Sequence, residues 1–191
     1  MTEVEGESRD EELDPELEAE REARRQLALA QIRQYPDSVL RMQAPPVENF
    51  DDDLKRLATR LGELMKDANG VGLAATQVGV LRRVFVFARD EDGVAVLVNP
   101  EIVHRSDETE IDDEGCLSIQ GVTMPVERNT SVRIEGRDAN GDEVAYDLEG
   151  TPARIVQHEL DHLDGTTILD RTTPEARREA LAALRPRLVI R

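Results

Sequence analysis

The sequence predicts an α+β fold, in which antiparallel or mixed β-sheets pack around a central helix and a further helix lies at the C-terminus. Three observations lead to this prediction. Segments 83–98 and 131–148 each hold two short β-like runs separated by a turn signal. Segment 51–67 repeats apolar residues at helical spacing. Segment 151–165 begins with Thr-Pro, which favours the start of a helix, and ends with glycine, which favours the end of one.

The first core helix is expected from Asp51 to Asp67. Asp51 stands at its start, where an aspartate side chain can accept a hydrogen bond from a free backbone N–H group. Apolar residues recur every three or four positions, so one face can pack on a sheet. These residues are Leu54, Leu57, Leu61, Leu64 and Met65.

Two β-hairpins are expected after this helix. The second has the stronger signal, because its turn contains Asn140-Gly141 and both residues tolerate positive φ. The first turns through the charged segment 90–93. The four strands are predicted at Arg83–Ala88, Val94–Val98, Ser131–Glu135 and Glu143–Leu148.

Two helices complete the predicted fold. Thr151 is expected to be the N-cap of the central helix, with Pro152 at its first position and Gly165 near its end. The last helix is expected from Pro174 to Leu184.

The central helix carries the pattern H-E-x-x-H. His158 and His162 are four residues apart and therefore share one helix face, where both can bind one metal ion. Glu159 can reach the same site as a general base. The alternative is an amphipathic helix whose histidines only pack or form hydrogen bonds.

The third ligand is open at this point. In one class of metalloproteases a histidine follows at the position that Ile168 occupies here, so that class is disfavoured. Glu175 and Glu179 of the last helix are expected on a separate solvated helix, because Pro174 and several arginines surround them. His104 and the single cysteine, Cys116, remain. A thiolate would complete a His2Cys site with one open position, as in catalytic zinc centres. Cys116 could instead be a small buried residue or a nucleophile paired with histidine.

Three ordered motifs settle this choice. They are GVGLAATQ at Gly70–Gln77, EGCLS at Glu114–Ser118 and HELDH at His158–His162. Together they resemble the motifs of the peptide deformylase family, and the resemblance extends from about Leu27 to Arg187. It implies a metal-dependent hydrolase that removes the formyl group from the N-terminal methionine of nascent polypeptides and releases formate.

The resemblance also implies roles for individual residues. Cys116, His158 and His162 match the metal ligands, and Glu159 matches the general acid and base. Gln77 matches the amide that donates a hydrogen bond to the scissile carbonyl oxygen, a role shared with the backbone N–H of Leu117. One divalent metal ion is implied, Fe²⁺ in the cell, with Ni²⁺, Co²⁺ or Zn²⁺ as substitutes. Ligand types alone would suggest Zn²⁺.

The substrate contacts follow less directly. Gly72 matches a backbone position that lies alongside the substrate. Val71 and Ile155 are expected to line the methionine pocket, with ordinary core packing as the alternative. The segment 120–126 is interpreted as a loop and contains no arginine, although relatives often place a basic residue there.

Composition predicts one catalytic domain, at residues 26–191. Residues 1–25 hold eleven acidic and four arginine side chains and no aromatic residue, within a chain of net charge −17. This acidic extension is expected to be disordered or a loose solvated helix.

Residues 171–191 hold six arginines and two glutamates. This basic tail is either a solvated helix end or, as in deformylases that resemble this chain, a contact with the ribosome. Neither a membrane nor DNA is expected as a partner. The expected location is the cytoplasm, because no long apolar run or signal peptide is found. The alternatives are a metallopeptidase of other specificity and a catalytically impaired relative that only binds.

Overall fold

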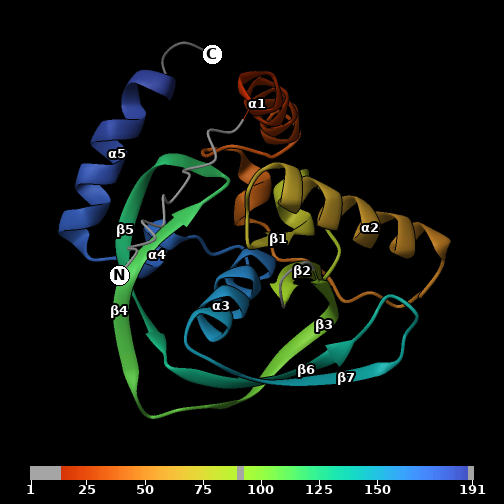
Figure 1. The fold of residues 1–191 in the computed structure, drawn as a ribbon. Helices are drawn as coiled ribbons and strands as arrows, with labels where there is room; N and C mark the ends of the chain where they lie inside the picture. The colour runs from red at the N-terminus through yellow and green to blue at the C-terminus, as the bar shows by residue number, and fades with distance from the viewer. Residues whose placement is uncertain (1–13, 90–92, 189–191) are drawn as a thin grey trace, which may run out of the picture.

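The computed structural model describes residues 14–89 and 93–188 (Figure 1). Its helices and strands confirm the predicted α+β class. In chain order the elements are α1 (Pro15–Leu29), the 3₁₀ helix η1 (Ser38–Arg41), α2 (Asp52–Asp67), β1 (Gly72–Ala74), the 3₁₀ helix η2 (Ala75–Val78), β2 (Val84–Arg89), β3 (Gly93–Arg105), β4 (Thr109–Cys116), β5 (Ile119–Asn129), β6 (Ser131–Arg137), β7 (Glu143–Glu149), α3 (Thr151–Leu163), α4 (Ile168–Arg171) and α5 (Pro174–Leu188).

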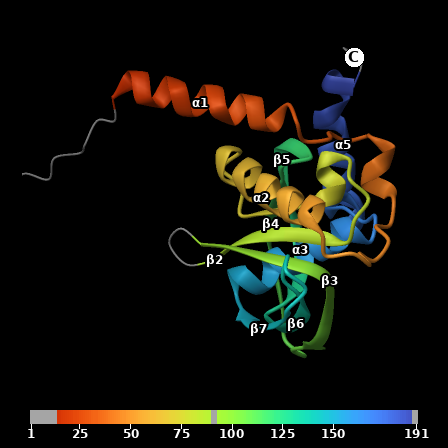
Figure 2. The same cartoon turned by 90° about the vertical axis from the view of Figure 1, so that its right-hand side faces the viewer.

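Two sheets surround α3. The larger sheet is antiparallel, with strand order β1-β2-β3-β6-β7, and the smaller one is the hairpin β4-β5. Helix α3 contacts strands of both sheets, while α2 contacts β1 and β2 (Figures 1 and 2). The predicted central helix is therefore α3.

Strand β2 is buried on both faces, which explains its continuous apolar sequence. Val84 and Val86 pack into one cluster with residues of α2, including Leu61. Phe85 and Phe87 point the other way and pack into a second cluster with residues of α3. Side chains alternate between the two faces of a strand, so one strand joins both layers of the core.

The predicted elements agree with the structure except near their ends. Helix α2 begins as expected, with the Asp51 side chain accepting from the backbone N–H of Leu54 at 2.9 Å. The N-cap prediction for α3 is wrong by one residue. Gly150 is the cap and Thr151 is the first helical residue, because Gly150 adopts a φ of 61° that suits glycine.

The prediction of a loop at residues 120–126 is also wrong. These residues belong to β5, which pairs with β4 in register from Thr109↔Asn129 to Cys116↔Ile119. Met124 and Val126 of β5 are buried in a third core cluster together with Ala180 and Leu184 of α5. This packing holds α5 on the smaller sheet.

The N-terminal segment contains a regular helix. Residues 1–13 of the acidic extension lie outside the described residues, and α1 covers most of the remainder. For residues 14–25 the structure thus shows the solvated-helix alternative, with all but one of these residues exposed. None of the helices in the described part of the chain combines the length and apolar character needed to span a bilayer.

Candidate metal centre

Three potential metal ligands meet between the smaller sheet and α3. Cys116 ends β4, while His158 and His162 lie one turn apart on α3. The Sγ atom of Cys116 lies 3.3 Å from Nε2 of His162, which lies 3.2 Å from Nε2 of His158. All three donor atoms lie within 4.8 Å of one another. His104 is exposed on β3, outside this group.

The donor set fits a cation. Nδ1 of His158 lies 2.9 Å from Oε2 of Glu114, so a proton on Nδ1 leaves the Nε2 lone pair directed at the other two donors. Burial would lower the pKa of His158, but hydrogen bonds with Cys116 and Glu114 outweigh burial and raise it well above its usual value. Burial and the neighbouring His158 lower the pKa of His162. The three converging donor atoms are of the kinds that bind a divalent transition-metal ion.

Glu159 lies beside this group and against the backbone of β1. A methyl group placed on Gly72 would stand 2.3 Å from Oε1 of Glu159, so only glycine leaves room for this carboxyl. Burial raises the pKa of Glu159 to about 7. Oε2 of Glu159 is buried and has no hydrogen-bond partner among the described residues. The carboxyl is thus placed to exchange a proton with a bound molecule near neutral pH.

Gln77 is held in a defined orientation by its own neighbourhood. Its Oε1 accepts from the backbone N–H of Ala74 at 2.8 Å, which directs the amide nitrogen toward the site. Nε2 then donates to Ser118 at 3.2 Å and lies 3.8 Å from the Cys116 sulfur. Leu117 lies in the turn between β4 and β5, next to Cys116.

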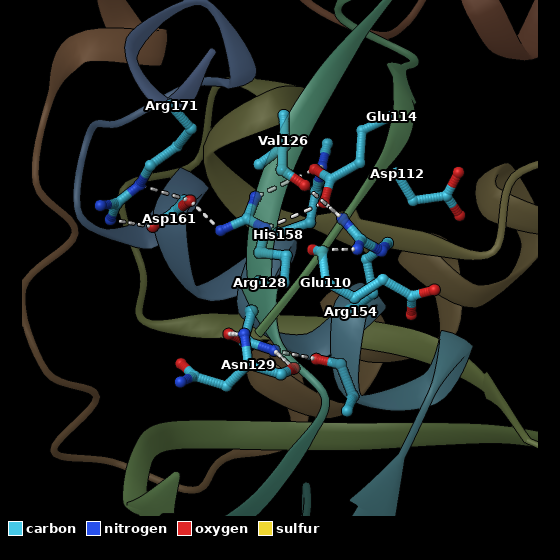
Figure 3. Close-up of polar contacts among 12 residues, drawn as sticks. Glu110, Asp112, Glu114, Val126, Arg128, Asn129, Arg154, His158, Asp161 and Arg171 are labelled. Atoms are coloured by element: carbon cyan, nitrogen blue, oxygen red, sulfur yellow. Dashed lines mark hydrogen bonds and ion pairs between the residues drawn. The ribbon is translucent and has the colours of Figure 1, made fainter. Parts of the chain in front are cut away.

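A buried ion network supports His158 from behind (Figure 3). Arg128 donates two hydrogen bonds to Glu114, at 2.9 and 3.0 Å, and one to Asp161 at 2.6 Å. Asp161 also pairs with Arg171. Burial alone would raise the pKa of Glu114, but hydrogen bonds from His158 and Arg128 outweigh this effect. The pKa of Glu114 is therefore lowered to about 2. Glu114 is therefore an anion that fixes the ring of His158.

Sequence reasoning did not identify this network. Glu114 and Asp161 stand inside the recognised motifs EGCLS and HELDH, so their positions offered a signal. Arg128 offered none, because only the fold brings it between the two carboxylates.

A cavity of about 740 Å³ opens over the site. Among its lining residues are Gln77, Cys116, Leu117, His158 and Glu159, while His162 lies deeper and is buried. The predicted substrate contacts Val71, Gly72 and Ile155 line it as well, together with Thr151 and Arg154. Val71 is 55% exposed, so core packing does not account for it.

Known proteins resemble the chain over most of its length. Residues 29–178 match the family described as polypeptide deformylase. A peptide deformylase of Desulforudis audaxviator is 46% identical over 147 residues, which cover 77% of this chain and 96% of that protein.

Solved structures agree with this similarity. The peptide deformylase of Thermotoga maritima superposes with a TM-score of 0.72 at 43% identity, covering 75% of this chain and 97% of that one. The deformylase of Legionella pneumophila gives a TM-score of 0.78 at 38% identity, covering 84% of this chain and 96% of its own.

Proposed function

The chain belongs to the polypeptide deformylase family, and from that premise we propose that Cys116, His158 and His162 hold the metal ion of its reaction. The enzyme removes the N-formyl group from nascent polypeptides. The observation that carries the assignment to these residues is the convergence of three donor atoms within 4.8 Å beneath a cavity that Glu159 also lines. We further propose that residues 26–191 form the catalytic domain, with residues 1–25 as an extension.

A divalent ion bound by this donor set supplies Lewis-acid chemistry, because it lowers the pKa of water toward neutrality and polarises a carbonyl group. We propose Fe²⁺ for this role, although thiolate and imidazole ligands also suit Zn²⁺, Ni²⁺ and Co²⁺.

Glu159 moves the proton in the proposed reaction. Its carboxylate takes a proton from the water molecule whose oxygen bonds to the formyl carbon. When the bond between that carbon and the nitrogen breaks, Glu159 gives the proton to the leaving amine. The products are formate and a free N-terminal methionine. A pKa near 7 for Glu159 suits both transfers at neutral pH.

Negative charge develops on the formyl oxygen during this step. The orientation of Gln77, set by the Ala74 N–H, leaves its amide nitrogen as a donor for that oxygen. The backbone N–H of Leu117 is proposed as the second donor. Preorganised donors of this kind are each worth about 10²–10³ in rate.

The peptide is proposed to lie along the backbone of Gly72, with the methionine side chain against Val71 and Ile155. All three residues line the cavity. The assignment is tested by measuring formate release from a formyl-Met peptide with anaerobically prepared protein of known metal content. Cleavage of unblocked peptides without formate release would contradict it and favour the metallopeptidase alternative.

Gly72→Ala is expected to lower kcat by about 10²-fold, because the new methyl group displaces the Glu159 carboxyl from its position. Formate release and thermal unfolding should be measured together. Gly62→Ala on α2 is the matched control, since its methyl group would meet Val94 at a tolerable 3.4 Å and alanine favours the helix. A Gly72→Ala enzyme with unchanged kcat would show that Glu159 needs no such close approach.

We also propose that α5 attaches the enzyme to the ribosome, in the cytoplasm where nascent chains emerge. Arg177 and Arg178 are exposed on α5. Deleting the helix would uncover Ala180 and Leu184, which are buried against the smaller sheet, so a change of charge is the better test.

The double variant Arg177→Glu, Arg178→Glu is expected to reduce co-sedimentation with ribosomes at low salt and to flatten its dependence on salt concentration. Its control is Arg56→Glu, Arg60→Glu on α2, which makes the same charge change at exposed positions. Equal loss of co-sedimentation in both double variants would exclude a specific role for α5.

A further inference from the structure

Helix α1 lies outside the region that the family shares. The match to the family begins at residue 29, whereas α1 covers Pro15–Leu29. Figure 2 shows α1 extending beyond the body of the molecule. Every residue from Asp14 to Leu27 is exposed except Arg25, which is half-buried. Arg25 is therefore the residue between Asp14 and Leu27 that is partly covered by its surroundings.

The end of α1 is fixed relative to the candidate site. Ala28 and Leu29 are buried in the core cluster that includes α2. The chain that follows is tied to the site itself, because the backbone N–H of Arg33 donates to the carbonyl of Gln77 at 2.7 Å. The backbone N–H of Tyr35 likewise donates to the Ser118 carbonyl at 2.8 Å. Arg25 lies one helical turn before Leu29 and therefore close to this fixed end of the helix.

Arg25 and Leu29 both line the cavity above the metal centre. Two of the lining residues are arginines, Arg25 and Arg154. Arg154 donates hydrogen bonds to Glu114 and to two backbone carbonyls, at 2.8 and 2.9 Å. It therefore belongs to the ion network around Glu114. Arg25 instead pairs with Glu22 of its own helix at 3.3 Å, where both side chains are more than a third exposed. Such a pair is weak and exchanges easily.

The lining residues from β4, β5 and the turn between them include no basic side chain. The segment 120–123 of β5 lines the cavity without a basic residue, and Asp113 of β4 lines it with a negative one. Arg25 would offset the negative charge of Asp113 for an acidic peptide that enters the cavity. A guanidinium group can donate to backbone carbonyls and can bind a carboxylate through two hydrogen bonds.

We propose that Arg25 contacts the substrate peptide downstream of the formylated methionine and favours substrates with an acidic side chain there. This inference rests on the proposed function, because the formyl group must lie at Glu159 for the rest of the peptide to leave through the cavity mouth. The N-terminal extension is then a part of the substrate site, and Arg25 sets specificity without taking part in the chemistry.

The test compares formylated tetrapeptide amides that carry Asp or Lys at the second, third or fourth position. Arg25→Ala is expected to raise KM for at least one Asp peptide about threefold at low ionic strength, with kcat unchanged. The effect should disappear in high salt, since exposed charges are screened. Arg25→Lys should retain part of the effect.

Arg24→Ala is the matched control, because Arg24 is exposed, pairs with Glu20 at 3.9 Å and does not line the cavity. It should leave every KM unchanged. Equal effects of Arg24→Ala and Arg25→Ala, or a loss of kcat shared by all peptides, would overturn the proposal.

Binding of fluorescent, already deformylated product peptides gives a readout that needs no turnover. Weaker binding of Asp peptides to Arg25→Ala than to wild type supports the contact between Arg25 and the peptide. This result would support the contact even if wild type released no formate, an outcome that would contradict only the proposed reaction. If wild type releases formate but wild type and Arg25→Ala bind the Asp peptides equally well, the proposed contact of Arg25 is overturned. The proposed reaction is then still supported.

Discussion

Glu159→Gln is expected to lower kcat by about 10²–10⁴-fold while the metal content stays at the wild-type level, because general acid–base catalysis is worth this much. The glutamine side chain has nearly the same shape, so it fits against Gly72, but it cannot accept the proton of the attacking water. The metal ligands are unchanged, since Glu159 lies outside the group of donor atoms formed by Cys116, His158 and His162. Formate release and elemental analysis of the same sample measure both effects.

Glu149→Gln is the matched control, because Glu149 is exposed at the end of β7. It should leave both activity and metal content unchanged. The role of Glu159 would be contradicted by a variant that keeps its metal and more than about a tenth of wild-type kcat, since a general base normally contributes far more. A variant that loses its metal would instead show that Glu159 is a ligand.

Local sequence patterns predicted four strands of the larger sheet, which correspond to β2, β3, β6 and β7. The run Val84–Phe87 packs against a different core cluster on each face of the strand. A strand that is buried on both faces has a continuous apolar sequence, which can be recognised without knowledge of its neighbours. The N-cap at Asp51 and the turn at Asn140-Gly141 are also local, because neighbouring residues decide their conformations. These elements could be read from the sequence alone.

The smaller sheet could not be predicted in the same way. Strand β4 has the sequence TEIDDEGC, whose exposed acidic residues look like a solvated loop. In β5, Gly121 adopts a φ of 80° and Pro125 lacks a backbone donor, so neither favours a strand. The pairing of β4 with β5 and the packing of Met124 and Val126 against α5 outweigh these preferences. Tertiary contacts therefore decide this part of the fold.

The same limit applies to the surroundings of the site. The motifs indicated the residues that we propose act on a substrate, because the motifs resemble those of the family. The positions of Arg128 and Arg25 depend on the tertiary fold. Arg128 bridges two buried carboxylates, and Arg25 reaches the cavity from helix α1. An arginine is compatible with almost any exposed position, and its sequence context does not show which arginine will be buried or directed at a cavity.

Cys116→Ala is expected to abolish tight metal binding and with it nearly all activity. The thiolate is one of three protein donors, and its loss leaves two imidazole nitrogens, fewer than the three protein ligands of catalytic zinc sites. Bound metal also stabilises a folded protein, by about 2.7 kcal/mol when the free ion is at 100 times its Kd. The variant should therefore lose the rise in unfolding temperature that metal addition gives to wild type.

The metal-free proteins provide the control for this prediction. Cys116 is only half-buried, and alanine fits in its place, so metal-free Cys116→Ala and metal-free wild type should unfold at nearly the same temperature. A large difference between them would mean that the substitution damages the fold, and loss of metal would then say nothing about ligation. With matched metal-free stabilities, the decisive result is the metal titration: a variant that binds one ion as tightly as wild type would exclude the Cys116 thiolate as a ligand. The remaining donors, His158 and His162, would then need a third partner from the cavity, whose lining includes the carboxyl groups of Glu159, Glu114 and Asp113.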